Sequence, residues 1–204
     1  MNEEQDYIRD IAQIRSIMER SSKFLSLAGW AGIMAGLYAL TGAYVAYTVF
    51  EFNPDELIYS STQSANLPKV ILVALFVLFL AISTAIFLSS NKAAKRGEKL
   101  WNALVKRLLI NMAVPLITGG LLIIILIAKG FIGLMAPFAL LFYGIALYNA
   151  SQFTYEEIKS LGLIQIGLGL FSTYFVAYGL VCWALGFGVA HIAYGIYMHY
   201  WYER

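Results

Sequence analysis

Apolar stretches long enough to cross a lipid bilayer constrain this chain more than any other feature of its sequence. A helix needs about 20 consecutive, mostly apolar residues to cross the hydrocarbon core. The charged residues are gathered between such stretches, and only 13% of the 204 residues are charged. A soluble domain has about a quarter of its residues charged. We therefore predict an all-α, polytopic membrane protein. Its six transmembrane helices would span about residues 25–50, 68–90, 108–128, 131–150, 161–181 and 184–200.

Residues 2–50 carry a seam of apolar or small residues, spaced alternately by four and three positions. Its members are mostly bulky before Leu25 and all Ala or Gly after it. Bulky residues drive helix association in water, whereas small residues let helix backbones approach closely in lipid. We therefore predict an amphipathic cytoplasmic helix over residues 1–24 that leads into a transmembrane bundle over residues 25–204. The predicted association seam is Tyr7, Ile11, Ile14 and Met18.

Two readings of this opening stretch stay open. In one, residues 3–50 form a single continuous helix. In the other, Ser21 or Ser22 caps a new helix, and the piece before it lies on the membrane surface. In both, the first span would contact other helices closely through its small residues. These contact residues are Gly32, Gly36, Ala39 and Gly42.

The basic residues predict the orientation of the chain. Placing both termini in the cytoplasm puts all of the 14 lysines and arginines there except Lys69 and Lys129. Cytoplasmic loops of membrane proteins carry an excess of Lys and Arg. The start MNEEQDYIRD is acidic and polar, and does not resemble a cleaved signal peptide. We expect a multi-pass protein of the bacterial inner (plasma) membrane.

Short matches between spans suggest an internal repeat. Tyr143-Gly144-Ile145 in the fourth span recurs as Tyr194-Gly195-Ile196 in the sixth, and the first and fifth spans share Gly-Leu and Val-Ala-Tyr at matching spacing. Three repeated helical hairpins would explain these matches. Sequences of low complexity also produce them by chance, so both explanations stay open.

His191 is the most suggestive single residue, because an ionisable group inside the bilayer is a candidate for function. Gln165 and Asn111 join it as a candidate interior polar or ligand site, since an amide facing lipid is costly. They would surround a cavity for a small neutral or hydrophobic molecule. The alternative is a neutral His191 that bonds to a tyrosine or a carbonyl in a packed interface.

Cofactor chemistry has little support in the sequence. His191 and His199 lie on one helix, about 12 Å apart at 1.5 Å per residue, and cannot face each other across a haem. The single cysteine, Cys182, excludes an intrachain disulfide. The spans contain no acidic residue and no nucleophile motif. We expect no catalytic residue, metal site or cofactor, and no nucleic-acid partner.

Two functions remain after these exclusions. The first is a non-enzymatic scaffold or signalling subunit that self-associates, or binds a protein partner, through its N-terminal helix. The second is a channel or transporter with a cavity near His191. The first predicts that removing residues 2–20 changes the oligomeric state, and the second predicts a continuous polar cavity that reaches His191.

Overall fold

A computed structural model describes residues 29–52, 66–95, 101 and 103–202 of the chain. The association seam from Tyr7 to Met18 lies outside the described residues. So do the amphipathic helix over residues 1–24 and the question of whether residues 3–50 form one helix. The seam and the amphipathic helix therefore remain predictions, and the continuity of residues 3–50 remains open.

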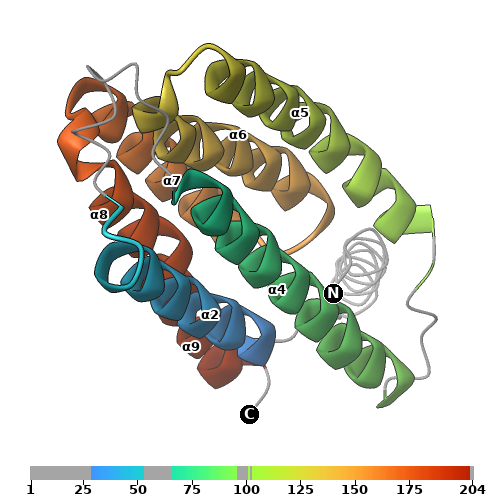
Figure 1. The fold of residues 1–204 in the computed structure, drawn as a ribbon. Coiled ribbons are helices and arrows are strands. Elements are labelled where there is room, and N and C mark those ends of the chain that lie inside the picture. The colour runs from blue at the N-terminus through green and yellow to red at the C-terminus, as the bar shows by residue number, and fades with distance from the viewer. Residues whose placement is uncertain (1–28, 53–65, 96–100, 102, 203–204) are drawn as a thin grey trace, which may run out of the picture.

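The described residues form helices and turns, with no strand among them (Figure 1). The long helices are α2 (Gly29–Thr48), α4 (Leu67–Lys95), α5 (Ala103–Ala128), α6 (Met135–Ala150), α7 (Glu157–Tyr174) and α9 (His191–Tyr202). Between them lie the short elements η1 (Ile132–Leu134), η2 (Ser151–Phe153), η3 (Val176–Tyr178), α8 (Gly179–Trp183) and η4 (Ala184–Ala190). Of these, η4 is a π-helix, and it joins α8 to α9.

Among the described residues, four helical segments are long and apolar enough to cross a membrane, which indicates a membrane protein. They are Leu67–Lys95, Ala103–Ala128, Ile132–Phe153 and Val176–Tyr202. The other two predicted spans correspond to α2 and α7, which have 20 and 18 residues. Both are helices; α2 is rich in glycine, alanine and tyrosine, and α7 contains Glu157, Lys159 and Gln165, which lower its mean hydropathy.

The predicted spans over residues 161–181 and 184–200 imply a turn near Cys182, and this prediction is wrong. Cys182 lies inside α8, and the fifth span ends earlier, where α7 stops at Tyr174 and Phe175 leaves the helical conformation with φ −108° and ψ 74°. This turn contains no proline or glycine at its centre. Aromatic contacts surround it instead, because the Phe175 ring lies 4.7 Å from that of Tyr174 and 4.8 Å from that of Phe171. The sequence therefore gave no ordinary turn signal at this position.

The long helices pack in two groups joined by the C-terminal segment. Helix α2 contacts α4 on one side and α9 on the other, while α6 contacts α5 and α7. Both groups are visible in Figure 1. The segment α8–η4 contacts α6 and α7, and η4 also contacts α2, so that η4 connects the groups.

Glycines bring α2 and α9 into backbone contact. A Cβ atom at Gly29 would lie 2.7 Å from the Gly195 carbonyl oxygen, and one at Gly195 would lie 2.6 Å from the Gly29 carbonyl oxygen. Two turns after Gly29, a Cβ at Gly36 would lie 2.6 Å from the carbonyl oxygen of Gly188 in η4. Such distances leave no room for any side chain. Close approach of this kind is typical of helix contacts in membranes.

The predicted contact residues of the first span serve two different neighbours. Gly32 and Gly36 face α9 and η4, whereas Gly42 faces Val77 of α4. Ala39 is buried, with 2% of its surface exposed. The small residues of α2 therefore allow close approach on two sides of the helix.

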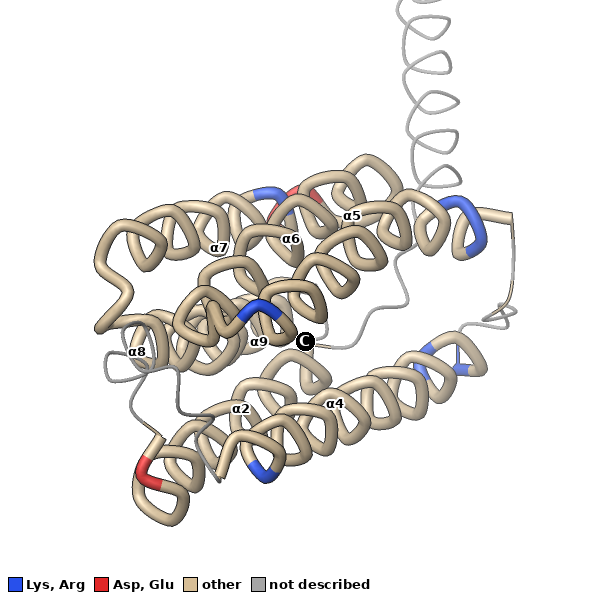
Figure 2. The backbone as a smooth tube through the Cα atoms, turned by 45° about the horizontal axis from the view of Figure 1, so that its top comes forward, with Lys and Arg blue, Asp and Glu red and all other residues tan. Residues whose placement is uncertain are grey.

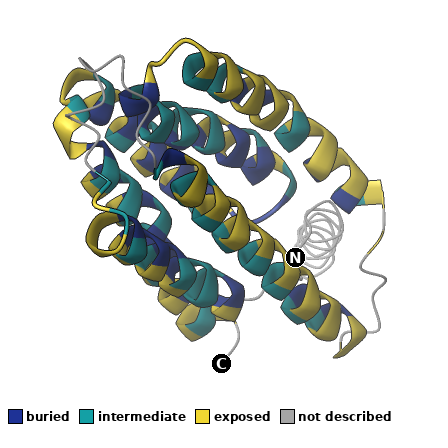
Figure 3. Cartoon of the chain, viewed as in Figure 1, coloured by how far each residue is buried: buried dark blue, intermediate teal, exposed yellow. Residues whose placement is uncertain are grey.

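A second glycine crossing joins α6 to α7. A Cβ at Gly144 would lie 2.7 Å from the Gly162 carbonyl oxygen, and one at Gly162 would lie 2.8 Å from the Gly144 carbonyl oxygen. Figure 3 shows buried residues concentrated along these central helices, while α4 and α5 are largely exposed. The exposed side chains of α4 and α5 are mostly large and apolar, as a lipid-facing surface requires.

The charged residues that the structure describes lie at or near the ends of the helices (Figure 2). Lys92 and Lys95 end α4, and Lys106 and Arg107 belong to the first turns of α5. This distribution leaves the middle of each long helix free of charge among the described residues.

Candidate functional site

A cluster of buried polar side chains lies where α6, α7 and α9 meet the π-helix η4. Helix α6 contributes Tyr143, α7 contributes Gln165, and His191 is the first residue of α9. Gln165 and His191 both bond to the backbone carbonyl of Gly186 in η4, and Tyr143 bonds to the other side of the His191 ring. Gln165 is fully buried, and only 7% of the surface of His191 is exposed.

Four distances define the cluster. The Tyr143 hydroxyl lies 2.9 Å from Nε2 of His191, and Nδ1 of His191 lies 2.9 Å from the Gly186 carbonyl oxygen. The Gln165 Nε2 group donates to the same carbonyl oxygen at 2.8 Å. The distance from Gln165 Nε2 to His191 Nδ1 is 3.4 Å.

These distances assign the imidazole tautomer. A carbonyl oxygen can only accept, so Nδ1 of His191 must carry the proton that it shares with Gly186. Burial of His191 favours the neutral ring, because a charge is costly away from water. In the neutral ring Nε2 is an acceptor, and the Tyr143 hydroxyl donates a hydrogen bond to it. The Gln165 amide and Nδ1 are both donors to Gly186, which explains why they lie near each other without bonding.

The π-helix explains why the Gly186 carbonyl is available to two side-chain donors. Hydrogen bonds in a π-helix run from residue i to residue i+5, and such turns often occur at functional positions. The His191 ring bonds to the carbonyl five residues earlier, within this π-helix. Residue 186 must also be glycine, because a Cβ there would collide with Oε1 of Gln165 and with Leu140.

Aromatic rings close the cluster on one side. The Phe187 ring stacks on His191 with their centroids 6.0 Å apart and their planes at 16°. The Tyr143 ring lies 4.9 Å from Phe187 and 5.5 Å from His191. These contacts fix the orientation of the imidazole and exclude a larger group from its face.

Two buried oxygens near the cluster have no hydrogen-bond partner among the described residues. They are Oε1 of Gln165 and the hydroxyl of Tyr194, three residues after His191 on α9. Tyr194 packs against Leu147, Ile158 and Leu161. An unpaired buried polar group typically costs about 1–3 kcal/mol. Both ring nitrogens of His191 are thus hydrogen-bonded, whereas Oε1 of Gln165 and the Tyr194 hydroxyl, at the edge of the cluster, are destabilising.

Asn111 does not belong to this cluster. Its side chain is exposed on α5, and its amide nitrogen donates to the carbonyl oxygen of Arg107 on the same helix at 2.8 Å. A side chain that bonds one turn back does not need a partner on another helix. The structure therefore brings His191 and Gln165 together and separates Asn111 from them. His199 lies elsewhere on α9, with its ring edge-on to Trp30 at 5.5 Å.

The alternative that His191 bonds to a tyrosine or a carbonyl is confirmed, because it bonds to both. These partners, Tyr143 and Gly186, were not predicted from the sequence. Tyr143 stood out only as part of the repeated Tyr-Gly-Ile motif, and Gly186 carried no signal. Within the described residues, no three His, Cys, Asp or Glu side chains come close enough to hold a metal ion.

Comparison of the chain with protein-family models, with curated proteins and with solved structures finds no match. The class of protein therefore follows from the structure alone, as an all-helical membrane-type protein with a buried polar cluster.

Proposed function

We propose that the protein is a non-enzymatic scaffold or signalling subunit of the bacterial inner (plasma) membrane. It crosses the membrane six times with both termini in the cytoplasm, and it self-associates or binds a protein partner through the N-terminal helix. The observation that carries this proposal is the closed hydrogen bonding of His191. The most suggestive chemical group of the chain is used to hold three helices together, and both its nitrogens are already bonded.

Six spans are supported by the arrangement of α2 and α7. Each packs against a helix that is apolar enough to cross the membrane, α2 against α4 and α7 against α6. Glycines of both helices allow this packing, since Gly42 of α2 meets Val77 of α4 and Gly162 of α7 meets Gly144 of α6. Close packing through glycines is typical of membrane helices, and it is compatible with membrane crossing.

A channel or transporter for a small neutral molecule is the second candidate. The unpaired oxygens of Gln165 and Tyr194 favour it, because they could bond to a solute. Against it, the surface hollow lined by Trp30, Thr84 and Phe87 lies between α2 and α4, away from His191. Solute uptake into proteoliposomes that is reduced by Tyr194→Phe would support transport, whereas uptake no greater than in protein-free vesicles would remove this candidate.

Light scattering of the detergent-solubilised protein tests the scaffold proposal. We expect full-length protein to be a dimer or larger, and a version that begins at Ser21 to be smaller while keeping its helix content. Ile14→Ser, on the predicted seam, should weaken association, whereas Ala12→Ser, on the opposite side of the same predicted helix, should not. An equal mass for the full-length and shortened proteins would contradict self-association through this helix.

A further inference from the structure

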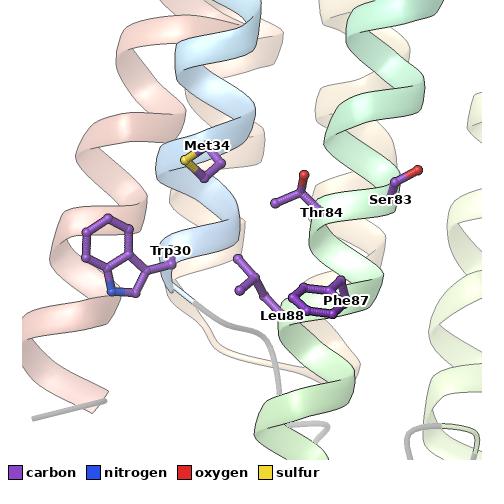
Figure 4. A pocket seen from close by; sticks show the side chains of 6 residues that line it. All are labelled: Trp30, Met34, Ser83, Thr84, Phe87 and Leu88. Carbon is purple, nitrogen blue, oxygen red and sulfur yellow. The ribbon is translucent and has the colours of Figure 1, made fainter.

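A shallow hollow lies between α2 and α4, near the end of α4 that carries two lysines. Trp30 and Met34 line it from α2, and Ser83, Thr84, Phe87 and Leu88 line it from α4 (Figure 4). Its volume is about 540 Å³, within the range of roughly 300–1,000 Å³ that ligand sites occupy. Gly42 and Val77 hold α2 and α4 together further along, so the two helices form its fixed walls.

The chemistry of the walls selects an apolar occupant. Carbon-rich side chains form most of the surface, with Phe87 65% exposed and Trp30 51% exposed. One of the two hydroxyls is already used, since that of Thr84 bonds with the Tyr38 hydroxyl at 3.3 Å. A hollow of this kind that opens sideways from a membrane helix faces hydrocarbon, and an acyl chain matches both its polarity and its direction.

The lysines at the end of α4 select the headgroup of the occupant. Thr84, Leu88 and Lys95 are spaced by four and seven residues, so they lie along one face of the helix. Lys92 follows Leu88 by one turn. The rise from Leu88 to Lys95 is about 10 Å at 1.5 Å per residue, so both lysines lie within two turns of the hollow. Lysines near helix ends extend to the membrane interface and attract anionic lipid.

Trp30 places the hollow at the level of the membrane interface. Tryptophan is enriched where hydrocarbon meets the headgroups. The Trp30 ring is exposed, and its edge contact with the His199 ring fixes its position. Along α4 the apolar hollow comes first and the two lysines follow it. A phospholipid has the same order, with its acyl chains followed by its headgroup.

We propose that this hollow is a specific binding site for one anionic phospholipid. An acyl chain lies between α2 and α4 against Phe87 and Leu88, and the phosphate of the headgroup is held by Lys92 and Lys95. The site is separate from the polar cluster at His191. It requires neither the predicted oligomer nor any activity, so it can fail or hold independently of the proposed function.

Native mass spectrometry of the full-length protein, released from nanodiscs with equal phosphatidylglycerol and phosphatidylcholine, tests the acyl-chain site. We expect one retained phospholipid per chain. Phe87→Ala should lower retention of the lipid roughly tenfold. The lipid would cover about half of the Phe87 side chain, and losing that apolar contact weakens binding by about that factor. Phe79→Ala is the matched control, since Phe79 lies on the same helix with the same 65% exposure but outside the hollow.

The headgroup is tested in the same experiment. We expect phosphatidylglycerol to be retained in preference to phosphatidylcholine, and Lys92→Gln with Lys95→Gln to reduce that preference roughly fivefold per lysine. Lys106→Gln on α5 is the control, because it removes a charge from a different helix. Circular dichroism verifies that each variant keeps its helix content.

Three results would overturn the proposal. Equal lipid retention by Phe87→Ala and Phe79→Ala would remove the hollow as the site. Equal retention of the two lipids by the unaltered protein would remove the anionic headgroup. A second copy of the chain that is retained in place of lipid, and lost only in Phe87→Ala, would assign the hollow to a protein contact.

Discussion

The crossing of α6 with α7 and the contact of α2 with α4 represent two different ways of packing helices. At the first, Gly144 and Gly162 place two backbones in mutual contact. At the second, Gly42 receives the side chain of Val77, and Tyr38 bonds with Thr84 at 3.3 Å. Of the 29 residues of α4, only Leu67, Ser89 and Ala93 are buried.

This difference separates a tightly constrained interior from a peripheral helix. Helix α6 is enclosed by α5, α7 and the C-terminal segment, and its tyrosine belongs to the polar cluster. Helix α4 contacts chiefly α2, and Leu67 and Ile71 at its start pack near Ile132. We therefore expect substitutions at the α6–α7 crossing to affect stability most, and those at the α2–α4 contact to affect it least.

The largest effect is expected for Gly162→Ala. The new methyl group would meet the Gly144 carbonyl oxygen at 2.8 Å and the Tyr148 backbone nitrogen at 2.9 Å, so the helices must move apart. Overpacking of this kind costs about 1–3 kcal/mol, and we expect the upper end. Thermal unfolding in detergent measures it. Gly167→Ala, where a Cβ would meet nothing within 4 Å, is the control and should leave the melting temperature unchanged or slightly higher.

A smaller loss is expected for Gly195→Ala at the α2–α9 crossing. The added Cβ would lie 2.6 Å from the Gly29 carbonyl oxygen and from the Ile33 backbone nitrogen. Helix α2 can shift more easily than α7, because its neighbour on the side away from η4 and α9 is the exposed α4. We expect a loss of about 1–2 kcal/mol in the same unfolding assay. Gly120→Ala, which has open space around it, should be neutral. A loss larger than that of Gly162→Ala would reverse the comparison.

The polar cluster should contribute less than either glycine crossing. Tyr143→Phe removes the donor to Nε2 of His191 and leaves that nitrogen unpaired, which we expect to cost about 1 kcal/mol, the lower end of the range for a buried unpaired group. Tyr194→Phe removes a hydroxyl that has no partner among the described residues, and should be neutral or stabilising. Chemical unfolding of the two variants side by side makes the comparison. Equal losses would mean that the Tyr143 bond contributes nothing specific.

The smallest effect is expected for Tyr38→Phe between α2 and α4. Its hydroxyl is 3.3 Å from that of Thr84, a long and partly buried hydrogen bond. Side-chain hydrogen bonds between membrane helices average about 0.6 kcal/mol, and we expect a few tenths here. Tyr44→Phe is the control, since Tyr44 is exposed on the same helix. A loss comparable to that of Gly162→Ala would show that α4 is not peripheral.

The class of the fold could be predicted from the sequence, because charge segregation and apolar length report on the membrane directly. The small residues Gly32 and Gly36 also indicated close packing, although not that Gly42 would face a different helix. The end of α7 could not be predicted. Its turn at Phe175 depends on aromatic contacts, and no proline or glycine marks its centre.

The candidate site could be predicted only in part. His191 and Gln165 stood out because polar side chains inside a membrane need partners. Asn111 met the same criterion but bonds to its own helix, an option that composition cannot exclude. The Gly186 carbonyl could not be found from the sequence, because a π-helix changes which backbone groups are available and leaves no residue signal.

The protonation of His191 tests the central claim, a closed polar cluster at the heart of the bundle, most directly. Solid-state ¹⁵N NMR in bilayers, with His199→Gln used to assign the signals, distinguishes the two imidazole nitrogens. We expect a neutral ring with its proton on Nδ1 and with Nε2 accepting a hydrogen bond that disappears in Tyr143→Phe. A proton on Nε2, or on both nitrogens, would contradict the closed cluster and reopen His191 as a site for a ligand.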